Sequence, residues 1–130
     1  MTQTPLAKKL VLKPGTRAAL IHAPEGYRER LNPLPEGTSV SEVLDGSFDL
    51  IQVFVRSLAE VNELAPQAMR ALKPGGVLWF SYPKQSSKVK TDINRDRGWD
   101  ALTREGWEGI ASISIDETWS GVRFVKRSPK

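Results

Sequence analysis

The sequence predicts an α/β fold in which helices alternate with the strands of a mostly parallel sheet. The connector Lys13–Pro14–Gly15 follows an apolar stretch and precedes a β-like run, and Lys73–Pro74–Gly75 repeats this arrangement later in the chain. Proline ends a helix and glycine supplies the backbone angles of a turn, so each connector is typical of a helix-to-strand junction. Two such junctions in a short chain favour a parallel sheet.

Six segments have the composition of strands. The first is almost entirely apolar, as expected for a strand that is buried on both faces of a sheet. The third, FDLIQVFV, gives the strongest pattern. The six predicted strands are residues 17–23, 38–40, 48–55, 77–82, 110–115 and 122–125.

A helix is expected between the third and fourth strands. Ser57 and Glu60 match the S-x-x-E capping box, in which side chains satisfy free amides of the first helical turn. Pro66 has no amide hydrogen for the turn before it, so we expect it to kink this helix or to begin a second one. Apolar residues recur on one face at helical spacing, namely Leu58, Val61, Leu64, Ala68 and Leu72.

The last third of the chain predicts another helix and then a hairpin. The helix should start near Thr91 or Asp92 and end by Gly106, with Gly98 leaving its middle undefined. Residues 116–121 (DETWSG) separate the last two strands and are rich in turn-forming residues. The sheet is therefore predicted to end in an antiparallel hairpin.

A parallel sheet that ends in such a hairpin resembles the class I S-adenosylmethionine-dependent methyltransferases. Residues 48–82, where a helix separates FDLIQVFV from ALKPGGVLWFSY, look like the middle of such an enzyme. A closer resemblance, over nearly the whole chain, is to an uncharacterised small bacterial family. The family and this chain share three motifs: Tyr-Pro-Lys after a strand, then Thr-Asp-Ile, and near the end a Trp-x-Gly-x-Arg-like motif, here Trp119, Gly121 and Arg123. The resemblance implies a three-layer, Rossmann-like fold, truncated and degenerate, and it implies no activity.

The segments that would hold S-adenosylmethionine depart from the methyltransferase pattern. The cofactor binds at a glycine-rich turn after the first strand, where bare backbone approaches the ligand. Here residues 22–27 read HAPEGY, with one glycine and a proline that lacks an amide donor. Glu42 is the nearby carboxylate that could hold the ribose, and its register is left open. Too few residues lie between the first predicted strand and Phe48 to form two further helix–strand units. We therefore expect no cofactor.

The composition predicts one globular domain over residues 1–130. Its 39% hydrophobic and 26% charged residues are ordinary for such a domain. The absence of cysteine excludes disulfides, thiolate nucleophiles and sulfur-based zinc sites. No run is long enough to span a bilayer and no secretion signal is evident, so we expect a cytoplasmic protein with no membrane partner. The net charge of +4 weakly favours anionic partners.

A ligand site is expected where the parallel strands end. This edge should bring together His22 and Glu25, the residue Arg56 before the helix, and the hairpin residues Asp116 and Trp119. His22 is the one histidine and could act as a general base, but the sequence places no second catalytic group beside it, so a structural role is favoured. We expect no catalytic residue and no metal site.

The loop at residues 83–91 (PKQSSKVKT) is the most ligand-like segment. Lys84 supplies charge, Ser86 and Ser87 supply hydroxyls, and the helix start expected next offers free amides to an anion. Asp92 would compete for those amides, so a mobile, solvated loop is favoured over anion binding.

Trp119 could stack on a flat ligand or cover the edge of the sheet, and the covering role is favoured. The other three tryptophans, Trp79, Trp99 and Trp107, are expected to pack in the core or against helices.

Three functions remain open at this point. The first is a non-catalytic binding or interaction module for a small anionic ligand or nucleotide. The second is a small S-adenosylmethionine-dependent transferase in which Glu42 or Asp49 compensates for the missing contacts. The third is a weak nucleic-acid-associated protein, although no recognised nucleic-acid motif accompanies the basic residues, so we do not favour a nucleic-acid partner. Exposed edge strands would also allow a homodimer.

Overall fold

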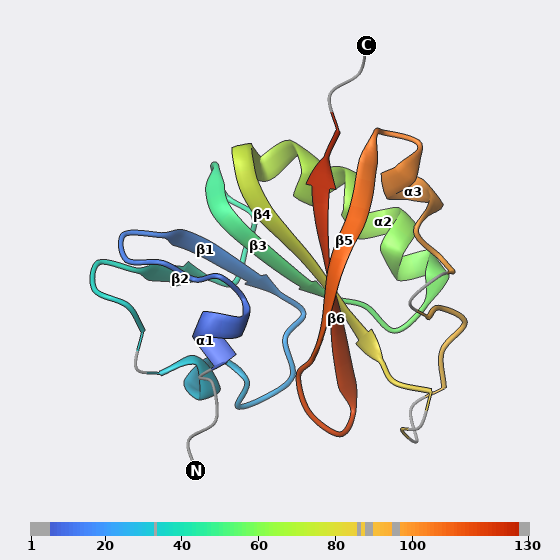
Figure 1. Ribbon diagram of the computed structural model, residues 1–130, viewed down its shortest axis with the longest axis horizontal. Coiled ribbons are helices and arrows are strands. Elements are labelled where there is room, and N and C mark those ends of the chain that lie inside the picture. The colour runs from blue at the N-terminus through green and yellow to red at the C-terminus, as the bar shows by residue number, and fades with distance from the viewer. Residues whose placement is uncertain (1–5, 33, 86, 88–89, 95–96, 128–130) are drawn as a thin grey trace.

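One six-stranded sheet organises the chain, with the strand order β2-β1-β3-β4-β6-β5 (Figure 1). The computed structural model describes residues 6–32, 34–85, 87, 90–94 and 97–127. Strands β1 to β4 are mutually parallel, whereas β6 runs antiparallel to both β4 and β5. The predicted parallel sheet with a closing hairpin is thus confirmed. The bounds are β1 Arg17–Ile21, β2 Ser39–Ser41, β3 Phe48–Phe54, β4 Leu72–Pro83, β5 Trp107–Ser114 and β6 Trp119–Lys126.

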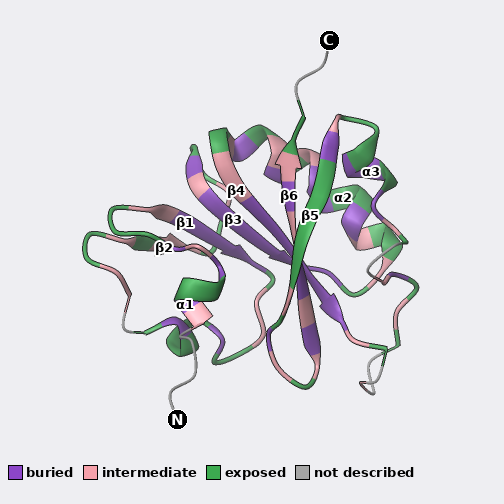
Figure 2. Cartoon of the chain, in the orientation of Figure 1, coloured by how far each residue is buried: buried purple, intermediate pink, exposed green. Residues whose placement is uncertain are grey.

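Short helices cover both faces of the sheet and make three layers. Helix α2 (Leu58–Ala71) and the single turn α3 (Asp100–Thr103) pack on one face, over a core that includes Ile51, Phe80 and Phe124. The other face is covered by α1 (Leu6–Lys9) and the 3-10 turn η1 (Arg28–Leu31), over a second core. Figure 2 shows β3 and the second half of β4 buried and most of β5 exposed, as expected for central and edge strands.

Helix α2 begins as the sequence predicts. The Ser57 hydroxyl accepts a hydrogen bond from the Glu60 amide at 3.2 Å, and the Glu60 carboxylate accepts one from the amide of Arg56. The expected second helix at Pro66 does not form, because Pro66 lies inside an uninterrupted helix. Val61, five positions before it, and Ala68, two positions after it, are fully buried against the sheet, and this packing offsets the hydrogen bond that proline cannot make.

The helix predicted from Thr91 or Asp92 to Gly106 is wrong in its extent, because only α3 forms. Asp92 instead accepts a hydrogen bond from the Leu58 amide at 2.7 Å and so caps α2 from a distant loop. Gly98 has φ +109°, and the Ile93 side chain occupies the place where a Cβ atom of residue 98 would lie. This compact turn is specific to glycine and is incompatible with a helix through residue 98.

The segment between β1 and β3 is short, as predicted. Its described residues, 22–32 and 34–47, form only η1 and β2, so a single strand lies outside β1 and one 3-10 turn stands where a full helix would follow β1. The N-terminal segment fills part of the resulting space, since the indole of Trp79 donates to the carbonyl of Leu10 at 2.9 Å.

The three core tryptophans are placed as predicted. Trp79, Trp99 and Trp107 are 1%, 6% and 8% exposed. Within the described residues, no helix has the length and apolar character needed to cross a membrane.

Candidate functional site at the carboxyl edge

The carboxyl edge is the end of the sheet at which β1, β3 and β4 finish. Ile21 pairs with Val53, the next residue Phe54 pairs with Ser81, and Pro83 pairs with Trp119 of β6. Each of these residues lies at or near the end of its strand. The register therefore gathers the loops at His22, Arg56, Lys84 and Asp116 along one edge, as the sequence analysis expects.

The loop after β1 is a closed turn. Its backbone turns at His22, which has φ +60°, and at Gly26, which has φ +82°, and the Tyr27 amide donates to the Pro24 carbonyl at 3.0 Å. The side chains of His22 and Glu25 are exposed. Among the described residues, neither makes a hydrogen bond or ion pair with another candidate residue.

The hairpin is held to η1 by an ion pair. Arg30 donates to the Asp116 carboxylate at 2.9 Å, and the same carboxylate accepts from the amides of Thr118 and Trp119, both at 2.8 Å. Burial by itself would raise the pKa of Asp116, but the hydrogen bonds from Arg30 and the two amides outweigh it. The pKa of this carboxyl therefore lies below its ordinary value, and Asp116 is ionised at neutral pH.

Trp119 closes the edge rather than standing free in the hairpin. It is 5% exposed, and its ring packs edge-on against Phe54 with the centroids 5.0 Å apart. The Arg56 guanidinium lies over the Trp119 ring, 5.2 Å from its centroid. Arg56 and Trp119 are thus brought together, with the indole engaged by the protein itself.

A buried polar chain, which the sequence analysis did not identify, lies beneath this edge. The Tyr27 hydroxyl donates to Gln52 Oε1 at 3.0 Å, and Gln52 Nε2 donates to Ser81 Oγ at 2.9 Å. Gln52 and Ser81 are fully buried and Tyr27 is 1% exposed. Desolvation by burial raises the pKa of Tyr27 to about 12, so the phenol stays protonated. The available signal was Gln52 itself, a polar residue within the apolar run LIQVFV.

The acidic residue after β2 is already paired. Glu42 directly follows Ser41, the last residue of β2, which settles its register. Arg28 of η1 donates to the Glu42 carboxylate at 3.0 Å and to the Val40 carbonyl at 3.0 Å. An arginine therefore lies against the carboxylate that would hold the ribose hydroxyls in a methyltransferase, and the residues present here fit S-adenosylmethionine poorly.

The loop after β4 turns inward to the hairpin. Lys84 Nζ donates to the Ser114 hydroxyl at 2.6 Å, and the Lys84 amide donates to the Thr118 carbonyl at 2.7 Å. The Ser87 hydroxyl donates to the Lys84 carbonyl at 2.7 Å. Ser86 lies outside the described residues. The helix start expected after this loop is not found among the described residues 90–94, and these residues therefore do not offer the anion-binding amides of a helix.

Comparisons with known proteins identify the fold. No protein-family model matches the chain, and no curated protein matches it. Among solved structures, the precorrin-6y C5,15-methyltransferase of Geobacter metallireducens is similar with a TM-score of 0.60 and 13% identity, over 92% of this chain and 84% of that one. An S-adenosylmethionine-dependent methyltransferase of Thiobacillus denitrificans, solved with S-adenosyl-L-homocysteine, has a TM-score of 0.57 and 9% identity, over 94% and 89%. The chain therefore has a class I methyltransferase-like fold, with the region between β1 and β3 shortened.

Proposed function

We propose that the protein is a non-catalytic binding or interaction module built on a methyltransferase-like fold. The observation that carries this proposal is that three cationic side chains of the carboxyl edge are already engaged by groups of the protein itself. Arg28 pairs with Glu42, Arg30 with Asp116, and Lys84 with Ser114. A ligand at this edge would have to replace these interactions, since both members of a separated pair must find new partners.

The loop after β1 also supports the proposal. In a cofactor-binding turn, a helix amino terminus and bare backbone amides face the ligand. Here the turn contains Pro24, which has no amide hydrogen, and it leads into the four-residue 3-10 turn η1 rather than a helix. This turn therefore offers a nucleoside fewer amide donors than a cofactor-binding turn does.

A transferase that retains S-adenosylmethionine is the second candidate, supported by the fold alone. Asp49, one of the two carboxylates suggested to compensate for lost contacts, lies at the opposite edge of the sheet, at the start of β3. There the Arg17 amide donates to it at 2.8 Å, and this bond, together with Lys73 at 3.4 Å, holds the pKa of Asp49 below its ordinary value despite some desolvation. Glu42 alone remains at the carboxyl edge.

Titration calorimetry with S-adenosylmethionine tests the proposal. We expect no binding heat at millimolar cofactor with the natural sequence. The matched variant Arg28→Ala frees Glu42 and also removes the hydrogen bond to the Val40 carbonyl of β2, so its melting temperature checks that it folds. Heat with this variant alone would identify the ion pair as the block and support the proposal. Saturable heat with the natural sequence would refute it.

A further inference from the structure

A basic groove lies at the amino edge of the sheet, far from the loops that follow the parallel strands. It forms at the start of β4, which is not paired with the end of β6: the pairing of these strands begins at Leu78 and Phe124, and the register with β3 is irregular between Leu72 and Val77. A cavity of about 450 Å³ occupies this gap. Its lining comes from the end of α2, residues 72–76, Trp107 and the end of β6.

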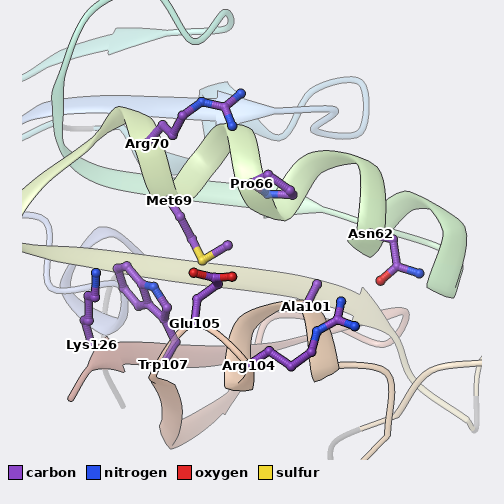
Figure 3. A pocket seen from close by; sticks show the side chains of 9 residues that line it. All are labelled: Asn62, Pro66, Met69, Arg70, Ala101, Arg104, Glu105, Trp107 and Lys126. Atoms are coloured by element: carbon purple, nitrogen blue, oxygen red, sulfur yellow. The ribbon is translucent and has the colours of Figure 1, made fainter. Parts of the chain in front are cut away.

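A second cavity of about 430 Å³ adjoins the first, since Met69, Trp107 and Lys126 line both. Figure 3 shows Met69 reaching from α2 toward Glu105 and Trp107, which follow α3, with Lys126 beside the indole. Arg70, from the same helix, also lines this second cavity. The two cavities together could accommodate a ligand with a compact charged group and a flat apolar part.

Positive charge dominates the first cavity. Among its described lining residues are four cations, Lys73, Arg123, Lys126 and Arg127, and no carboxylate. Lys73 is paired with Asp49 at 3.4 Å and Arg127 with Glu108 at 2.6 Å. Arg123 and Lys126 make no ion pair with the described residues. Their charges are therefore uncompensated, unlike those at the carboxyl edge.

Arg123 gives an independent indication of a ligand. Its Nε atom is buried and has no hydrogen-bond partner within the described part of the chain. A buried N–H group without an acceptor is destabilising, and native proteins normally avoid it. The Nε atom itself is closed to a ligand, but the two Nη atoms of a guanidinium can donate to two oxygens of one phosphate.

We propose that the basic groove binds a phosphate group of an organic ligand, with Arg123 and Lys126 holding the phosphate and the apolar part lying toward Met69 and Trp107. This proposal goes beyond the proposed function and does not depend on whether the carboxyl edge binds a cofactor. Phosphate is favoured over a carboxylate because a dianion can match two unpaired cations at once. A phosphomonoester of a free metabolite supplies such a dianion, whereas each phosphodiester of a nucleic acid supplies oxygens of the same geometry with one negative charge.

Nitrogen-edited NMR titration tests the proposal on the intact protein. The probes are a nucleoside 5′-monophosphate, its unphosphorylated nucleoside, inorganic phosphate and a short single-stranded oligonucleotide, all at constant ionic strength. We expect the monophosphate to shift the Trp107 indole N–H signal saturably and to leave that of Trp119 in place, while the nucleoside alone has little effect. Tighter binding of the oligonucleotide, with a steep dependence on salt, would assign the phosphate to a nucleic acid.

Three variants make the result specific. Lys126→Gln removes an exposed cation and should weaken phosphate binding about tenfold, the value expected for one charge-assisted hydrogen bond. Arg123→Gln should weaken it at least as much, and Lys126→Gln keeps the test valid if Arg123→Gln does not fold. Lys8→Gln, an equal change of charge on exposed α1, is the control and should bind normally. The proposal is overturned if no probe binds at millimolar concentration, or if all three variants bind as the natural sequence does.

Discussion

The carboxyl edge and the basic groove both contain cationic side chains, but these side chains differ in the groups that they contact. At the carboxyl edge, Arg28 and Arg30 each meet a carboxylate, and Arg56 lies over an indole. In the basic groove, Arg123 and Lys126 meet none within the described residues. The same side-chain chemistry thus contributes to stability at one end of the strands and remains available for binding at the other. Substitutions should separate these roles, with stability changing at the first end and affinity at the second.

The largest effect is expected for Trp119→Ala. Trp119 is buried at the carboxyl edge, so its loss should lower the free energy of unfolding by about 3–5 kcal/mol, the usual cost of removing a buried aromatic side chain. Urea denaturation measures this change. Trp119→Phe keeps the ring contact with Phe54 and should lose clearly less. A loss below about 1 kcal/mol for the alanine variant, typical of an exposed site, would contradict the closed edge described above.

An intermediate effect is expected for Tyr27→Phe. The variant leaves Gln52 Oε1 buried without its donor, so it should lose about 1–2 kcal/mol at neutral pH. Because the folded protein raises the pKa of Tyr27 from 10.0 to about 12, the unfolded chain loses this proton first as pH rises. The phenol's contribution to stability is complete below pH 10 and falls as pH rises toward 12.

Denaturation at several alkaline pH values checks this assignment. The natural sequence should lose more stability than Tyr27→Phe between pH 10 and pH 12, so the difference between them should shrink. If the free energies of unfolding of the two proteins fall equally over this pH range, Tyr27 is not buried as a protonated donor.

The smallest stability effect is expected for Lys126→Gln. The side chain is exposed and makes no ion pair with the described residues, so the free energy of unfolding should change by less than about 0.5 kcal/mol. Thermal and urea denaturation measure it. A larger loss would indicate that Lys126 supports the fold, and any change in phosphate binding could then no longer be read as loss of a ligand contact.

Much of the fold could be predicted because its signals are local. The capping residue Ser57 and the apolar run from Phe48 act through neighbours in the sequence, and both appear as expected. The helix predicted near Asp92 failed because Asp92 has a partner 34 positions away, the Leu58 amide. A local pattern of helix-forming residues carries no information about such a contact.

The candidate site was predicted in position but not in its interactions. Strand order and the rule for parallel sheets located the carboxyl edge, and the register placed its loops together. That Arg28 pairs with Glu42, and Arg30 with Asp116, depends on how η1 packs beside β2 and the hairpin. The basic groove was missed for a similar reason. Lys73 and Lys126 are far apart in the sequence, and only the folded sheet places them on the lining of one cavity.

The order of the strands has a consequence for assembly of the molecule. β6 lies between β4 and β5, although β5 precedes it along the chain, and in the sheet β5 pairs with β6 alone. During synthesis, β5 therefore has no strand to pair with until β6 has been made and has paired with β4. Disrupting β6 would detach two strands at once and expose the flank of β4, so this segment should govern whether a newly made chain reaches its native form or aggregates.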